Sequence, residues 1–323
     1  MEEIKCIFCE IESSQVVIEE NGYRGKKCSQ CGLIYVSPRP SFDEIVSLYG
    51  HDQAHISSAS HISDSFQKRL YARHNLGIIR SVVKSGALLE IGAGAGYFLD
   101  EARKIGFYPF GLELNPAQAD FIRSELKIPC AESPLSTTVF EGKKFDLVYH
   151  CDVIGHFFEP ISDFRKMNAV MQDGSFLIFE TGNLGDVDQH YFKYFQRFQY
   201  PDHLFSFSTD SLSKLLDRTG FEVLKIYRYA ILPQLILNQL TAGIRQRFFK
   251  SARQQGSSAN GGSTGKTAGG IQQSHMGLTL KMVIGPVWDY LNYLLRYKVG
   301  ALLPKKGRPQ SIIVIAQKRK TVG

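Results

Sequence analysis

Three glycines spaced two residues apart follow the apolar run Ala87–Ile91 and precede an apolar segment with helical spacing. They are Gly92, Gly94 and Gly96, and Glu90 lies two residues before the first. This pattern predicts a buried parallel strand that turns tightly into a helix. Glycines let the main chain approach a bound group closely, and a helix N-terminus offers N–H groups and positive dipole. The spacing therefore predicts a ligand-binding turn at residues 92–96.

A second acidic residue, Glu113, lies 17 residues after Gly96 at the end of the predicted strand 108–113. A carboxylate in that position can accept hydrogen bonds from both hydroxyl groups of a ribose. The glycine spacing differs from the G-x-G-x-x-G of dinucleotide-binding loops, which speaks against a nicotinamide oxidoreductase.

The E-x-G-x-G-x-G motif with its downstream Glu113 resembles the first motifs of class I S-adenosylmethionine-dependent methyltransferases. The resemblance implies S-adenosyl-L-methionine as cofactor. It also implies these cofactor-binding residues: Glu90, Gly92, Ala93, Gly94, Gly96, Glu113, Leu114 and Cys151.

The segment Tyr200-Pro201-Asp202-His203, followed by aromatic residues and serines, is similar to the acceptor site of zinc-containing sugar C-methyltransferases. The resemblance implies that His203 is a general base, Asp202 its orienting carboxylate and Tyr200 a hydrogen-bonding neighbour. An imidazole titrates near neutral pH, and an adjacent carboxylate favours its protonated form. The alternative is that His203 caps the helix beginning near Ser208.

Residues 144–160 resemble the fourth-strand motif of the same methyltransferase class, in which a histidine follows the strand. His156 matches that histidine and is a further catalytic candidate. Capping of the following helix is the alternative role. The usual Leu-Glu-His is replaced by Ile154-Gly155-His156, so the glutamate is missing. The turn also lacks [DNS]-P-P-[YFW], which makes exocyclic base amines weaker acceptor candidates.

Two Cys-x-x-Cys pairs lie near the N-terminus, separated by 18 residues: Cys6, Cys9, Cys28 and Cys31. This spacing predicts four thiolates around one tetrahedral zinc ion. With four protein ligands the site has no open position, so the role of the metal is structural. A redox pair is the alternative, but no thioredoxin-like strand and helix pattern surrounds either pair.

Strands alternate with helices from residue 87 to residue 180, which predicts an α/β, doubly wound, mostly parallel sheet of seven strands. The resemblance to class I methyltransferases implies that the final two strands, 220–226 and 311–318, pair antiparallel. The predicted organisation is a zinc ribbon (1–40), a helical lid or linker (41–86), a Rossmann-like methyltransferase core (87–229), an apolar helical insertion (230–307, with disorder at 251–274) and a last strand with a basic tail (308–323).

The chain has 323 residues, 43% of them hydrophobic, and a formal net charge of +7. Its acidic start, without an apolar run behind it, predicts a cytoplasmic protein with reduced cysteines. The excess of basic residues lies late in the chain. These residues form either a solvated surface or a binding surface for an anionic partner, and the sequence does not decide between the two. The insertion combines apolar, aromatic and basic residues, so residues 230–303 are expected to pack on the core, contact a second subunit or lie on the inner membrane face.

The sequence thus predicts methyl transfer to a small molecule, most plausibly a sugar, a nucleotide-sugar or a lipid-linked glycan. One alternative is an RNA methyltransferase that grips its substrate with the zinc segment, although the basic residues of that segment are offset by acidic ones. Another is a non-catalytic, membrane-associated partner protein of the same fold.

Overall fold

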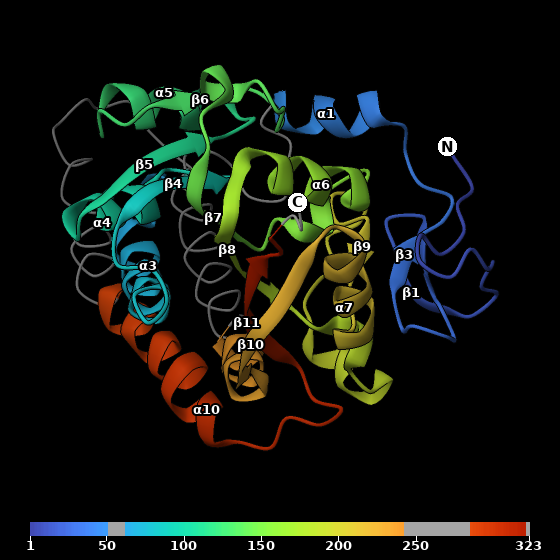
Figure 1. The fold of residues 1–323 in the computed structure, drawn as a ribbon. Coiled ribbons are helices and arrows are strands. Elements are labelled where there is room, and N and C mark those ends of the chain that lie inside the picture. Colours follow the sequence, from blue (N-terminus) through green and yellow to red (C-terminus); the bar gives the residue numbers. More distant parts are fainter. Residues whose placement is uncertain (51–61, 242–284, 321–323) are drawn as a thin grey trace, which may run out of the picture.

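The computed structural model describes residues 1–50, 62–241 and 285–320 (Figure 1). At its centre is a seven-stranded sheet in the order β10-β11-β8-β7-β4-β5-β6. The five strands from β8 to β6 pair in parallel, whereas β11 pairs antiparallel with both β8 and β10. The strands are β4 (Gly86–Ile91), β5 (Phe107–Leu112), β6 (Cys130–Ala131), β7 (Phe145–Cys151), β8 (Met171–Gly182), β10 (Phe221–Ala230) and β11 (Gln310–Lys318). The predicted mostly parallel, Rossmann-like sheet is confirmed.

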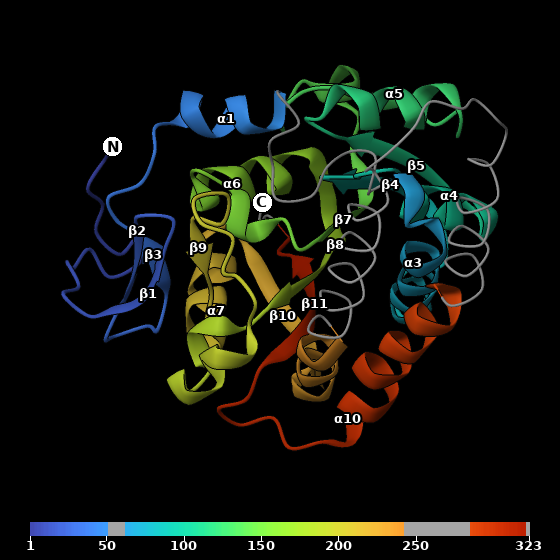
Figure 2. The same cartoon turned by 180° about the vertical axis from the view of Figure 1, so that it is seen from behind.

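Helices cover both faces of this sheet (Figures 1 and 2). One apolar cluster packs α3 (Ser65–Ile79), α4 (Tyr97–Lys104) and α5 (Pro116–Ser124) against the sheet. The other includes α6 (Pro160–Val170) and α7 (Thr209–Arg218). Because the central strands are covered on both sides, they carry continuous apolar runs, and Leu88 and Leu89 are both 0% exposed. The carboxyl ends of the parallel strands meet at one edge, where ligands bind in such folds.

Some element boundaries differ from the sequence prediction. Strand β10 extends to Ala230, because β11 supplies hydrogen-bonding partners as far as Gln310. Strand β8 begins at Met171 rather than Ser175, and its first residue pairs with Phe145. These extensions depend on a neighbouring strand distant in sequence, which local patterns do not report.

The N-terminal segment forms a second, four-stranded sheet together with part of the core. Its strands are β1 (Val16–Glu20), β2 (Tyr23–Lys27), β3 (Ile34–Val36) and β9 (Phe205–Ser206), in that order. Strand β9 belongs to the loop that leads into α7, so the ribbon is joined to the core by backbone pairing. Arg39 strengthens the junction: it is 4% exposed and binds the Glu159 carboxylate at 2.9 Å.

The described parts of the insertion are two helical segments. One spans 232–241, and the other begins at 285 and continues through a π-helical stretch (Leu294–Val299) into α10 (Gly300–Leu302). The predicted disordered stretch 251–274 lies outside the described residues. Helix α1 (Phe42–Gly50) follows the ribbon. Within 1–50, 62–241 and 285–320, none of the helices has the length and apolar character needed to cross a bilayer.

Candidate active site

The turn between β4 and α4 has the bare backbone that the glycine spacing predicts. Gly92, Gly94 and Gly96 have φ angles of 68°, 56° and 71°, a region that glycine adopts without strain. Packing adds a second requirement at Gly92, where a Cβ would lie 2.6 Å from Cγ2 of Val153. Gly96 is the N-cap of α4. The turn therefore depends on glycine for both its conformation and its close contact with the loop after β7.

Two carboxylates flank this turn. Glu113 accepts hydrogen bonds from the N–H groups of Gly94 at 2.7 Å and Asn115 at 2.8 Å. Glu90 is 5% exposed, and its Oε2 has no hydrogen-bond partner among the described residues. Burial, and then repulsion from Glu113, raise the pKa of Glu90 well above its usual value, while the ammonium of Lys68 opposes the shift. A buried carboxyl oxygen without a partner suits a ligand that brings a hydrogen-bond donor or a cation.

These residues fit the cofactor that the resemblance implies. Leu114 is 38% exposed beside Glu113, whereas Ala93 is buried in the turn. Cys151 ends β7 with its Sγ 3.9 Å from the Glu180 carboxylate, and burial raises the pKa of this thiol. Lys68 of α3 lies within electrostatic reach of Glu90, Cys151 and Asp152, although burial lowers its pKa. The turn at residues 92–96 together with Glu90 and Glu113, called the crevice below, thus offers bare main chain and acidic groups suited to an ammonium and to ribose hydroxyls.

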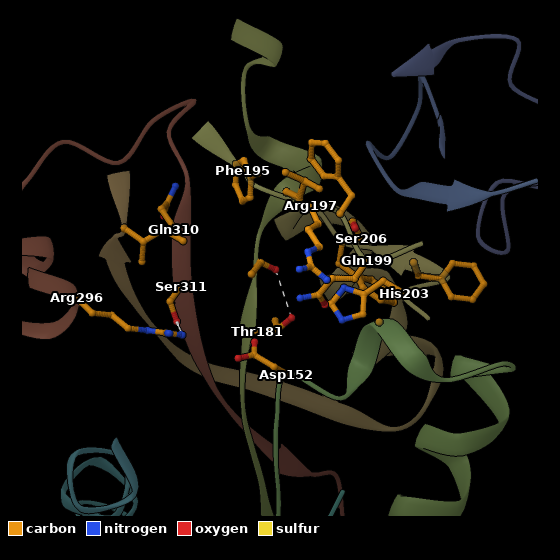
Figure 3. Close-up of a pocket in the computed structure, with 17 residues that line it drawn as sticks. Asp152, Thr181, Phe195, Arg197, Gln199, His203, Ser206, Arg296, Gln310 and Ser311 are labelled. Carbon is orange, nitrogen blue, oxygen red and sulfur yellow. Dashed lines mark hydrogen bonds between the residues drawn. The ribbon is translucent and has the colours of Figure 1, made fainter. Parts of the chain in front are cut away.

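A cavity of about 310 Å³ lies at the carboxyl ends of β7 and β8 (Figure 3). Its lining comes from segments that are far apart in the chain. Aromatic rings and polar side chains form most of the wall, together with Leu184 and Ile231. The residues with chemistry to offer are Asp152, Thr181, Phe195, Arg197, Gln199, His203, Arg296, Gln310 and Ser311.

The two predicted catalytic histidines lie together at this cavity. His203 lines it, and the ring of His156 packs edge-on against the His203 ring with centroids 4.2 Å apart. Nδ1 of His156 lies 3.0 Å from the Asp202 carboxylate and 3.0 Å from the Asp202 carbonyl oxygen. The Asp202 carboxylate therefore contacts His156, and the ring of His156 in turn contacts His203, which the resemblance gives as the partner of Asp202. Asp202 is 5% exposed, so this contact is shielded from water.

The missing glutamate of the fourth-strand motif has a packing reason. A Cβ on Gly155 would lie 3.0 Å from the carbonyl oxygen of Phe205 and 3.6 Å from the His203 ring. The carbonyl oxygen of Gly155 also accepts the N–H of Leu204 at 2.8 Å. Glycine at this position lets the loop that carries His203 approach the end of β7 closely. A glutamate side chain would have to displace that loop.

Tyr200 is not among the residues that line the cavity, and its role as a hydrogen-bonding neighbour of the catalytic residues stays a prediction. The side chain is 3% exposed and packs over Gly25 of β2, where the absence of a Cβ makes room for its hydroxyl group. The tip of the β1–β2 hairpin holds the preceding residues in place. The Glu20 carboxylate accepts the N–H groups of Phe198 at 2.9 Å and Tyr200 at 2.8 Å. The N-terminal ribbon therefore positions one wall of the cavity.

Arg296 brings the insertion into the same cavity. Its guanidinium donates to the Glu180 carboxylate at 2.7 Å and to the Ser311 hydroxyl at 2.9 Å. Glu180 is 0% exposed and also accepts hydrogen bonds from Asn75 and Tyr297. Burial alone would raise the pKa of Glu180, but Arg296 and these hydrogen bonds hold it below its usual value. This buried ion pair ties the second insertion helix to β8 and β11.

Comparison with known proteins identifies the domain that carries this site. Residues 66–226 match the family model described as a methyltransferase domain. Residues 66–226 therefore resemble methyltransferase domains, and this part of the chain is called the methyltransferase domain below. No curated protein matches the chain.

Solved structures resemble the methyltransferase domain and its surroundings in fold. Coclaurine N-methyltransferase bound to N-methylheliamine and SAH has 12% identity and a TM-score of 0.47, covering 87% of this chain and 89% of that one. The cyclopropane synthase MmaA2 from Mycobacterium tuberculosis has 14% identity and a TM-score of 0.46, covering 77% and 84%. The [4+2]-cyclase SpnF has 16% identity and a TM-score of 0.46, covering 77% and 81%. The names of these proteins describe different reactions, and no acceptor follows from them.

The four N-terminal cysteines converge beside the methyltransferase domain. The Sγ atoms of Cys6, Cys9, Cys28 and Cys31 all lie within 4.8 Å of one another. A tetrahedral zinc ion with Zn–S bonds of about 2.3 Å requires sulfur separations of about 3.8 Å, which this cluster can accommodate. Cys6, Cys28 and Cys31 are buried, and the hydrogen bond with Cys31 lowers the pKa of Cys6 to about 5. The donor set and its geometry fit a closed structural metal site.

Sequence reasoning missed three residues that shape the site of the methyltransferase domain. Asp152 lines the cavity with a φ of 53°, a left-handed conformation that is uncommon outside glycine and is concentrated at functional sites. Asp152 follows directly after β7 and could have been singled out from the sequence, because it adjoins the predicted cofactor residue Cys151. The contributions of Glu20 and Arg296 carry no such signal, because each acts across more than 100 residues of sequence.

Proposed function

We propose that this protein transfers a methyl group from S-adenosyl-L-methionine to a small-molecule acceptor, and that the acceptor is a sugar, a nucleotide-sugar or a lipid-linked glycan. One observation carries the proposal: the glycine crevice and the polar cavity meet at the end of β7. Val153, in the loop after β7, packs at Gly92 of the crevice, and the preceding residue, Asp152, lines the cavity. A methyl donor in the crevice and an acceptor in the cavity would therefore be neighbours.

The cofactor, when bound, supplies a methyl group already activated by a sulfonium. Glu90 and Glu113 would hold its ammonium and ribose groups, with Leu114 against its base. The remaining work of the protein is to align the acceptor and exclude water. His203 would accept the proton of a hydroxyl group or of an enolisable carbon, and His156, held by Asp202, would support its ring.

The cavity lining supports a hydroxyl-rich acceptor. Gln199, Gln310 and Thr181 offer amide and hydroxyl groups, and Phe195 offers an aromatic face. Such a mixture is typical of sites that bind rings carrying several hydroxyl groups, because it satisfies each polar group while covering the apolar ring faces. We further propose that Cys6, Cys9, Cys28 and Cys31 hold a structural zinc ion, whose role is to keep the ribbon against the cavity wall.

The test is mass spectrometry of cell extract incubated with the protein and methyl-labelled donor. The expected result is a labelled small molecule that is absent when Gly94→Arg protein replaces the wild type. Label found in RNase-sensitive material would support RNA methylation instead. Calorimetry without detectable binding of S-adenosylmethionine or its demethylated product would favour the non-catalytic alternative.

A further inference from the structure

The two helical segments of the insertion enclose an apolar groove of about 650 Å³. Residues 232–241 form one wall, and Leu291, Leu295 and Leu303 form the other. Among the described residues of the lining, Arg308 alone is charged, and it lies among nine apolar residues. The groove is larger than the acceptor cavity and has a different chemical character.

Exposed apolar side chains gather around the same groove. Thirteen large hydrophobic residues are exposed in the described structure, and six of them lie on these two segments. Leu302 is 87% exposed, Val287 67% and Leu240 64%. The second helix therefore has one buried side and one exposed apolar side. Its buried residues are Asn292, Tyr297 and Gly300. Its exposed apolar residues include Leu291, Val299 and Leu302. Several exposed apolar side chains on two neighbouring segments indicate an interaction site.

The charges of this region favour an anionic partner. Segments 231–241 and 285–309 contain a single acidic residue, Asp289, and five basic ones: Arg296, Lys298, Lys305, Lys306 and Arg308. Glu180 neutralises Arg296 within the core. Lys298 and Lys306 are exposed, and the Arg308 guanidinium has no ion-pair partner in the part of the chain that the structure describes. Basic residues that border an apolar surface match the anionic headgroups above a lipid layer.

We propose that this groove docks on an anionic membrane surface. The exposed leucines and Val287 enter the boundary between headgroups and acyl chains, and Lys298, Lys306 and Arg308 bind lipid phosphates. This contact is peripheral and reversible, since it combines limited apolar area with a few charges. The docking proposal does not depend on which acceptor is methylated.

Docking at this place would hold the acceptor cavity beside the lipid headgroups, because the two hollows share their walls. Leu295 lines the groove, and its neighbour Arg296 lines the cavity. In the same way, Leu232 lines the groove, and its neighbour Ile231 lines the cavity. Arg308 lines the groove two residues before Gln310, which lines the cavity.

The experiment is co-sedimentation of the full-length protein with phosphatidylcholine vesicles that do or do not contain one quarter phosphatidylglycerol. Wild-type protein is expected to bind the anionic vesicles and to lose that binding as salt is raised. Leu302→Glu should weaken binding at least tenfold, because it places a carboxylate in the apolar surface. Arg308→Gln should weaken it about fivefold, the effect of one basic residue near an anionic surface.

Two matched controls keep the test specific. Leu224→Glu changes an exposed leucine on β10, and Arg165→Gln changes an exposed arginine on α6, both outside the groove. Both variants should bind like the wild type, and calorimetric cofactor binding should show that all four variants are folded. The proposal is overturned if wild-type protein binds neither kind of vesicle, or if Leu302→Glu binds as well as wild type. Self-association that Leu302→Glu abolishes, without lipid binding, would assign the groove to a second copy of the chain.

Discussion

The proposed cofactor crevice and the proposed acceptor cavity are neighbours, yet they are built in opposite ways. The crevice takes most of its residues from one strand-turn-helix unit and from the end of the next strand, within residues 90–114. The cavity takes its lining from the loop after β7, from β8, the loop before α7, the insertion and β11, between residues 152 and 311. The crevice is therefore a local structure, and the cavity is a product of tertiary assembly.

Because of this difference, the binding of the cofactor and the binding of the acceptor depend on different parts of the chain. A local unit can be kept intact while the surrounding elements change, so one crevice can serve many cavities. In this protein the cavity depends on two regions outside the core: the N-terminal ribbon through Glu20, and the insertion through Arg296. Changes in the crevice should therefore abolish cofactor binding, whereas changes in the ribbon should affect turnover alone.

The largest effect is expected from Gly94→Arg. Position 94 has a φ of 56° and donates its N–H to Glu113, so a long side chain there blocks the crevice. Cofactor binding should fall below detection in calorimetry. Gly106→Arg is the control, since Gly106 also has a positive φ but a Cβ added there would meet no atom within 4 Å. Normal binding by folded Gly94→Arg protein would contradict the assignment of the crevice.

His203→Ala should be next in size and should act on the cavity alone. Loss of a general base typically lowers turnover by about 100- to 10,000-fold. Cofactor affinity should remain within a factor of two, because His203 lies outside the crevice. The measurement is kcat with the labelled donor, together with calorimetry. Full activity of His203→Ala would remove this residue as the base and direct attention to His156 and Asp152.

Cys28→Ser extends the comparison to the ribbon. Loss of a thiolate should release zinc, loosen β3 from β9 and displace the wall that Glu20 holds. Turnover should fall by roughly 10- to 100-fold, as expected for a small misplacement of an acceptor, with little change in cofactor affinity. Metal analysis checks the zinc. Glu20→Gln, which weakens the same wall without touching the metal, should lower turnover less and keep full zinc content.

The smallest effect concerns protons at Glu90. Burial and Glu113 raise the pKa of Glu90, so its carboxyl group stays protonated in the free protein to a higher pH than that of an ordinary glutamate. A cationic cofactor favours the ionised form, and binding then releases a proton. Affinity should rise with pH by up to about tenfold per unit, until the pH passes the raised pKa of free Glu90. Calorimetry in buffers of different ionisation enthalpy measures the proton. In Glu90→Gln the release should vanish, and its persistence would assign the proton to another group.

The sequence alone determined the sheet, its two layers of helices and the glycine turn, because apolar periodicity and glycine spacing are local signals. It also indicated the four cysteines that the structure brings within 4.8 Å of one another. The partner of Asp202, the position of Tyr200 and the contribution of Arg296 required the tertiary structure. Each is decided by contacts between elements 40 or more residues apart, and hydrophobic patterns along a chain do not specify which side chains meet at such distances.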